Sequence, residues 1–120
     1  MKLEHFNITG PIELLEEVRA FYVDALGLQE GFRPSVSTRG YWLYIGDQAV
    51  VHLNENPARN RPPEENFLDH IAFACDNLEE IKTRLERLHI PHKVNHYAAV
   101  NFTQIFLHDP AGTGIELNFR

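Results

Sequence analysis

Two stretches of the chain carry apolar residues at helical spacing, so each predicts an amphipathic helix. The first covers residues 12–26 and is followed by Gly27, a residue type that commonly ends helices. The second covers residues 78–88, where Asp76 is expected to cap the N-terminus with Glu79 at the capping-box position. The apolar side chains are Leu14, Leu15, Val18, Tyr22 and Leu26 in the first helix, and Leu78, Ile81, Leu85 and Leu88 in the second.

Each helical stretch is followed by two runs rich in aromatic and β-branched residues, a composition typical of β-strands. A cluster of turn-forming residues separates the two runs in each case, so two β-hairpins are predicted. Shorter strands are expected near residues 30–36 and 91–94. The hairpin strands are 40–45 and 49–54 in the first half of the chain, and 102–107 and 114–118 in the second.

The two halves of the chain resemble each other. An apolar, acidic, histidine, apolar sequence occurs around His5 and again around His70, an offset of 65 residues (70 − 5). The last strands of the two hairpins also correspond, with His52 matching Glu116 at an offset of 64 residues (116 − 52). We therefore predict an α+β protein in which one strand–helix–hairpin module occurs twice.

The predicted modules form one domain over residues 1–120. Module one covers about 1–55 and module two about 68–120. Residues from about 56 to 67 contain three prolines and mixed charge, which is typical of a linker.

Strand side chains alternate between two faces, and this alternation separates the polar residues from the apolar ones. In the four strands around His5, His52, His70 and Glu116, the large apolar residues fall on the face opposite these four. If the helices cover the apolar face, the four polar side chains lie on the other face, which a substrate could occupy.

Imidazole nitrogens and a carboxylate oxygen are suitable ligands for a divalent ion such as zinc, iron, manganese, nickel or cobalt. A single strand histidine more commonly has a structural or surface role. The four residues, however, occupy positions related by the repeat, so they could converge if the modules combine around a pseudo-two-fold axis. This set predicts a metal site formed by His5, His52, His70 and Glu116.

Composition limits which ligands, partners and cellular location the protein is expected to have. The chain has one cysteine, so a thiolate metal cluster and an internal disulfide are excluded. A net charge of −6 argues against a nucleic-acid partner, and the absence of a long apolar run argues against a membrane span. Because the N-terminus lacks the apolar block of a signal peptide, we expect a cytoplasmic protein.

Four stretches carry a resemblance to the vicinal oxygen chelate superfamily, which includes glyoxalase I, fosfomycin-resistance enzymes, extradiol dioxygenases and bleomycin-binding proteins. They are LEHFNI at Leu3–Ile8, VRAFYVDALGL at Val18–Leu28, LDHIAF at Leu68–Phe73 and FLHDPAGTGIEL at Phe106–Leu117. The resemblance implies two tandem βαβββ modules that form a curved mixed sheet around a metal cavity. It also implies a homodimer, with sites shared between modules or between subunits.

Carried over by residue, the resemblance places His5, His70 and Glu116 on the metal-ligand positions of the family, and His52 on the fourth. Glyoxalase I typically has glutamate at this fourth position, so His52 puts that particular reaction in doubt. Extradiol dioxygenases normally carry a tyrosine ten residues before the glutamate, and Phe106 occupies that position here.

The first functional hypothesis is a metal-dependent lyase or isomerase that acts on a small oxygenated substrate. The metal would act as a Lewis acid while Glu116 or His52 transfers a proton. The alternatives are an extradiol-type Fe(II) dioxygenase and a non-enzymatic protein that binds a small molecule such as an antibiotic. The residues expected to line a substrate pocket are Asn7, Trp42, Tyr44, Phe106 and His108.

Overall fold

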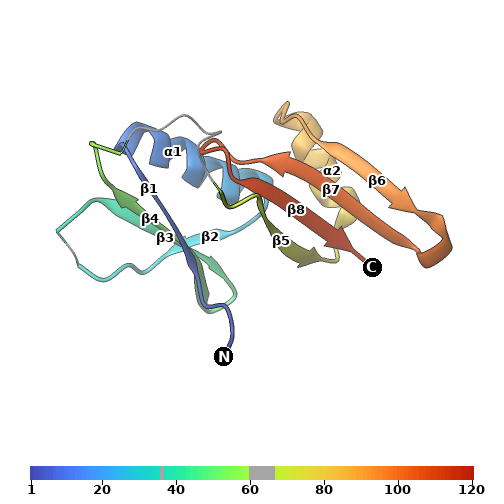
Figure 1. Cartoon of the computed structure of the whole chain (residues 1–120), viewed down its shortest axis with the longest axis horizontal. Helices are drawn as coiled ribbons and strands as arrows, with labels where there is room; N and C mark the ends of the chain where they lie inside the picture. Colours follow the sequence, from blue (N-terminus) through green and yellow to red (C-terminus); the bar gives the residue numbers. More distant parts are fainter. Residues whose placement is uncertain (36, 60–66) are drawn as a thin grey trace. The chain divides into compact units, whose positions relative to one another are not determined.

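The computed structural model describes residues 1–35, 37–59 and 67–120, and the chain divides into two compact units, Met1–Pro62 and Pro63–Arg120. Unit 1 contains β1 (Phe6–Gly10), α1 (Ile12–Ala20), β2 (Gln29–Gly31), β3 (Gly40–Ile45) and β4 (Gln48–Glu55) (Figure 1). Unit 2 contains β5 (His70–Cys75), α2 (Leu78–Arg87), β6 (Lys93–Tyr97), β7 (Phe102–His108) and β8 (Gly114–Phe119). Both units therefore have the order βαβββ, and the expected tandem α+β architecture is confirmed. Most of the expected linker lies outside the described residues.

Each unit holds one four-stranded mixed sheet. The strand orders are β1-β4-β3-β2 and β5-β8-β7-β6, so the first strand of each unit lies at a sheet edge beside the last. That outer pair is parallel and the other pairs are antiparallel. The two short strands expected from the sequence correspond to β2 and β6, although β2 is shorter than expected and β6 extends further toward the C-terminus.

The helices differ in detail from the sequence expectation. The first is α-helical only to Ala20 and continues as a π-helical turn, η1 (Phe21–Ala25), before Gly27 ends it at a φ of 81°. In the second, the expected Asp76 cap is wrong. Strand β5 runs to Cys75 and the helix begins at Leu78, so Asn77 occupies the cap position and no side chain caps the helix. No helix among the described residues is long and apolar enough to cross a membrane.

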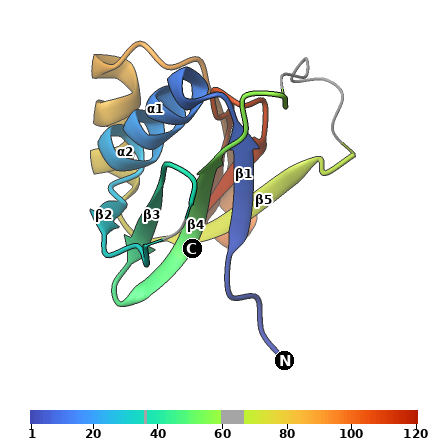
Figure 2. The ribbon, with the colours of Figure 1, turned by 90° about the vertical axis from the view of Figure 1, so that its left-hand side faces the viewer.

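In each unit the core lies between the helix and one face of the sheet, as shown for α1 in Figure 2. On β4 Val51 and Leu53 are fully buried, and on β8 the residues of the same parity, Ile115 and Leu117, are 1% exposed. The helices contribute the buried side chains Leu15 and Val18 from α1, and Ile81 and Leu85 from α2. Alternation then places His52 and Glu116 on the opposite face of each sheet, which we call the open face.

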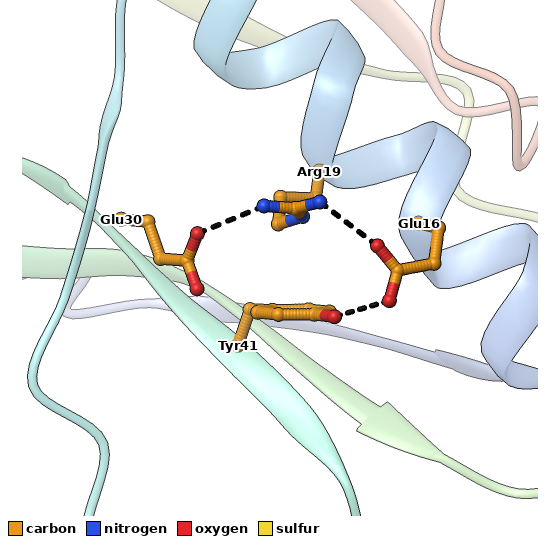
Figure 3. Close-up of polar contacts among 4 residues, drawn as sticks. All are labelled: Glu16, Arg19, Glu30 and Tyr41. Carbon is orange, nitrogen blue, oxygen red and sulfur yellow. Dashed lines mark hydrogen bonds and ion pairs between the residues drawn. The ribbon is translucent and has the colours of Figure 1, made fainter.

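Four polar side chains join α1 to the sheet on the covered face of unit 1 (Figure 3). Arg19 donates hydrogen bonds to Glu16 (2.9 Å) and Glu30 (3.0 Å), and its guanidinium lies 4.7 Å from the centre of the Tyr41 ring. The Tyr41 hydroxyl donates to Glu16. This hydrogen bond, supported by Arg19, holds the pKa of the Glu16 carboxyl below its ordinary value, and the same bond raises the pKa of Tyr41. The cluster therefore ties α1 to both β2 and β3.

η2 (Ala98–Val100) is a single 3₁₀ turn between β6 and β7. Asn101 ends it in the left-handed region at a φ of 47°. Asparagine tolerates this conformation better than most residues do, so the turn needs no glycine.

Candidate functional site

The four predicted ligands lie on the open faces, as two pairs. In unit 1, His52 of β4 pairs in register with Asn7 of β1 and Trp42 of β3. His5 lies immediately before β1, and its ring stacks on that of His52. In unit 2, His70 begins β5 and Glu116 lies at the centre of β8. Each unit thus brings one predicted pair together.

The pair in unit 2 is arranged as two ligands of one ion would be. The His70 Nε2 atom lies 3.3 Å from the Glu116 Oε2 atom. Two atoms bound to one tetrahedral ion at about 2.1 Å are separated by roughly 3.4 Å. The Glu116 side chain is 13% exposed and that of His70 is 48% exposed, so the pair remains accessible on the imidazole side.

A carboxylate orients the imidazole in both halves of the chain. The His70 Nδ1 atom donates to Asp69 at 2.8 Å, and the His5 Nδ1 atom donates to Glu4 at 3.0 Å. In each case the acid is the preceding residue, so the repeated acidic–histidine dipeptide has a structural meaning. Such a bond leaves Nε2 as the atom that can bind a metal. The bond from Asp69, together with the charge of Glu116, also raises the pKa of His70.

The pair in unit 1 has a different geometry. The rings of His5 and His52 are stacked 3.7 Å apart at 9°, and the Trp42 ring stacks on the other side of His52 at 4.0 Å and 10°. The lone pair of an imidazole nitrogen lies in the ring plane, so two stacked rings cannot both direct lone pairs at one ion. In these rotamers only one of the two histidines can bind a given ion, and both can bind only after a ring rotates.

His52 is further defined by its own surroundings. Its Nε2 atom lies 3.1 Å from the Ala49 carbonyl oxygen, so Nε2–H donates and Nδ1 is the acceptor. Burial lowers the pKa of His52, and the neighbouring His5 lowers it further. A neutral imidazole with an acceptor nitrogen is therefore present on this face.

The four predicted ligands fit a metal ion in their chemistry, but only one pair fits it in its geometry. Within each unit, taken over its described residues, no three His, Cys, Asp or Glu side chains lie close enough to hold one. The donor set of nitrogen and oxygen nevertheless suits a divalent ion, and the geometry of His70 and Glu116 fits one directly.

The predicted pocket residues also lie on open faces. In unit 1, Tyr44 shares the face of Trp42, and its ring lies over Gly31, where an added Cβ would come within 2.8 Å of it. In unit 2, Phe106 pairs with Glu116 in register, and His108 pairs with Gly114 at the exposed end of β7.

Two residues on the open faces escaped the sequence analysis. Gln104 of β7 donates to Glu116 Oε1 at 2.6 Å and to Asn118 Oδ1 at 3.0 Å. Arg33 donates to Asn54 Oδ1 at 2.8 Å, so its guanidinium lies on the open face of unit 1. Strand alternation could have identified Gln104, because it lies two residues from Phe106 and therefore shares its face. Arg33 follows β2 in a loop, and no sequence pattern indicates its position.

Comparison with solved structures identifies similar folds. A glyoxalase family protein from Bacillus anthracis has 25% identity and a TM-score of 0.74, and the match covers 100% of this chain and 95% of that one. The trypanothione-dependent glyoxalase I of Leishmania major has 21% identity and a TM-score of 0.72, covering 99% and 86%. The fosfomycin resistance protein FosX of Listeria monocytogenes, solved with Mn(II) and a dihydroxypropylphosphonic acid, has 16% identity and a TM-score of 0.72, covering 98% and 91%.

The last two likenesses concern the fold alone. A search of curated protein sequences gave no match. The model of the glyoxalase, bleomycin resistance protein and dioxygenase superfamily matches residues 3–117, which include all four predicted ligands. With two βαβββ units and a match over nearly its whole length, the chain belongs to the glyoxalase/bleomycin resistance protein/dioxygenase superfamily.

Proposed function

We propose that this chain is a metal-dependent enzyme that acts on a small oxygenated substrate by proton transfer, as a glyoxalase-like lyase or isomerase. The observation that carries the proposal is the pair in unit 2, where His70 Nε2 and Glu116 Oε2 lie at the separation of two ligands of one ion. The proposed ligands are His5, His52, His70 and Glu116, one pair from each unit. When bound, a divalent ion of the zinc, iron, manganese, nickel or cobalt type would supply Lewis-acid polarisation of substrate oxygens.

The side chains around the proposed metal site have separate proposed roles. Asp69 and Glu4 hold the two imidazoles with Nε2 available for binding. Both Glu116 oxygens have partners, because Oε1 accepts from Gln104 and Oε2 faces His70. The acceptor nitrogen of His52 has the chemistry of a general base and lies beside the aromatic surface of Trp42, against which a substrate can pack. We therefore assign metal binding to Glu116 and proton transfer to His52, whose single acceptor nitrogen serves as the base only while it is not bound to the metal.

The dioxygenase alternative receives less support. Phe106 lies directly opposite Glu116 in register, so the position that carries a tyrosine in extradiol dioxygenases presents no hydroxyl here. Oxygen uptake on catechols by Fe(II)-loaded protein would decide for it. A binding protein without activity is the remaining alternative.

Elemental analysis of untagged protein tests the proposal. We expect about one equivalent of a divalent metal per chain, loss of that metal in His70→Ala and Glu116→Ala, and weakened retention in His5→Ala and His52→Ala. His92→Ala is the matched control, because His92 lies outside the sheets and donates to a backbone carbonyl. Full metal retention in the His70 or Glu116 variant would exclude the proposed site.

Activity is tested by solvent exchange. We expect metal-loaded protein to catalyse deuterium exchange at the carbon next to the carbonyl of a small α-hydroxy ketone, measured by NMR in D₂O. The His52→Ala variant should lose exchange while it keeps part of its metal. A protein that binds metal but catalyses neither exchange nor oxygen uptake would support the binding alternative.

We also propose that the protein is a homodimer, as the family resemblance implies, and that it is cytoplasmic. Light scattering during size-exclusion chromatography should give about twice the 13.9 kDa mass of the chain. A monomer that binds one metal ion would show that one chain supplies the whole site.

A further inference from the structure

Gln104 lies on the open face of unit 2, between the proposed metal ligand Glu116 and Asn118. In the β7–β8 ladder, Gln104 pairs with Asn118, and Phe106 pairs with Glu116. The Gln104 side chain therefore reaches diagonally across the ladder to Glu116. A diagonal contact of this kind is within reach of a long side chain.

Two hydrogen bonds hold the side-chain amide of Gln104 in this position. Its nitrogen carries two hydrogens, and both have an acceptor: Glu116 Oε1 at 2.6 Å and Asn118 Oδ1 at 3.0 Å. The bond to the carboxylate is the shorter of the two, as expected when the acceptor is ionised. Asn118 thereby aims the amide, and the amide in turn holds Glu116.

This arrangement assigns different roles to the two carboxylate oxygens. Oε1 accepts from Gln104, while Oε2 lies 3.3 Å from His70 Nε2. Turning the carboxylate plane away from this orientation would break the Gln104 bond, whereas a half-turn only interchanges two equivalent oxygens. The Glu116 side chain is only 13% exposed, so water can replace that bond only in part.

We propose that Gln104 is a positioning residue that holds Glu116 so that Oε2 alone is presented to the metal. The inference rests on the proposed function, because it requires Glu116 to be a ligand. Residues that orient metal ligands through hydrogen bonds typically change metal affinity by about 10–100-fold when they are replaced. Both hydrogens of the Gln104 amide are donated, to Glu116 and Asn118, so its effect on the metal would pass through Glu116.

Metal titration of the full-length protein tests this role. Gln104→Met keeps the length of the side chain and removes both donors, whereas Gln29→Met makes the same change on the exposed strand β2 of the other unit. We expect Gln104→Met to bind Zn(II) at least about tenfold more weakly than wild type, and Gln29→Met to match wild type. The measurement is competition with a chromophoric chelator.

A second readout distinguishes positioning from a loss of folding. With Co(II) as the probe, Gln104→Met should change the intensity and position of the visible absorption bands, because Glu116 becomes free to bind through both oxygens. The metal-free Gln104→Met variant should still unfold in one cooperative thermal transition, as Gln29→Met does. If Gln104→Met does not fold, Gln104→Asn serves instead, since the shorter amide cannot reach Glu116.

The outcomes separate the inference from the function on which it rests. Wild-type protein that binds neither Zn(II) nor Co(II) would overturn the proposed function. Wild-type protein that binds metal, with Gln104→Met equal to Gln29→Met in affinity and Co(II) spectrum, would overturn the role of Gln104 and leave the function standing.

Discussion

Replacing Gly114 by alanine should displace the proposed metal-binding pair while leaving the chemical groups of His70 and Glu116 unchanged. Gly114 of β8 pairs with His70 of β5, and an added Cβ would lie 2.3 Å from the Asp69 carbonyl oxygen and 3.0 Å from the His70 Cβ. Real Cβ atoms do not approach other atoms closer than 3.0 Å, so the strands must separate by at least about 0.7 Å (3.0 − 2.3). The opposing atom belongs to the backbone, so no side-chain rotation can relieve the contact.

This displacement is large on the scale of metal coordination. Ligand distances tolerate only about 0.2 Å, and a misplacement near 1 Å can cost about 100-fold in function. We expect Gly114→Ala to bind Zn(II) about 10–100-fold more weakly than wild type. Strain should lower the free energy of unfolding by about 1–3 kcal/mol, reduced by about 0.4–1 kcal/mol from the stiffer unfolded chain.

The assays are Zn(II) competition and urea unfolding of the metal-free protein. Gly10→Ala is the control, because its added Cβ meets the flexible end of Leu14 at 3.2 Å and its nearest backbone atom at 3.5 Å. If Gly114→Ala matched Gly10→Ala in both affinity and stability, the coupling of this backbone contact to the site would be refuted.

Three further perturbations have defined outcomes. The Glu16 carboxyl has a lowered pKa in the folded state, so it stabilises the fold above its ordinary pKa near 4.5, and this stabilisation is lost as the pH falls through the folded value. In urea unfolding between pH 3 and 7, the free energy of unfolding should therefore fall less steeply with acid in Tyr41→Phe than in wild type. Identical profiles would contradict this. Leu53→Ala should lower the free energy of unfolding by about 2–5 kcal/mol, because Leu53 is fully buried, and a loss below about 1 kcal/mol would show that the core closes around the gap. Trp42 is the only tryptophan and stacks on His52, so Zn(II) should change its fluorescence in wild type but not in His52→Ala; an equal change in both would place the metal elsewhere.

The sequence was sufficient to place candidate site residues wherever their position depends on a local pattern along the chain. Alternation along β4 and β8 placed His52 and Glu116 opposite the buried residues, and the structure has that arrangement. The repeated dipeptide around His5 and His70 also located the histidines whose Nδ1 atoms bond to the preceding acid. The first result follows from the period of a strand, and the second from a repeated dipeptide whose members are adjacent in the chain, so neither needs knowledge of tertiary contacts.

The sequence was insufficient to predict features that depend on side-chain torsions or on the register between strands distant in the chain. The stacking of His5, His52 and Trp42 depends on side-chain rotamers on β3, on β4 and in the segment before β1. The Asp76 cap failed because the end of β5 sets where the helix can begin, and that boundary depends on pairing with β8. The partner of Gln104 likewise became apparent only from the register of β7 against β8.

The correspondence of His52 with Glu116 across the two halves has an electrostatic consequence. A divalent ion bound by three neutral imidazoles and one carboxylate would carry a formal net charge of +1 at the site, whereas a second carboxylate in place of His52 would bring it to zero. A positive centre in a partly desolvated site stabilises an oxyanion more strongly than a neutral centre does. If the proposed four residues bind one ion, the histidine at position 52 would thus set the charge that an ionising substrate meets.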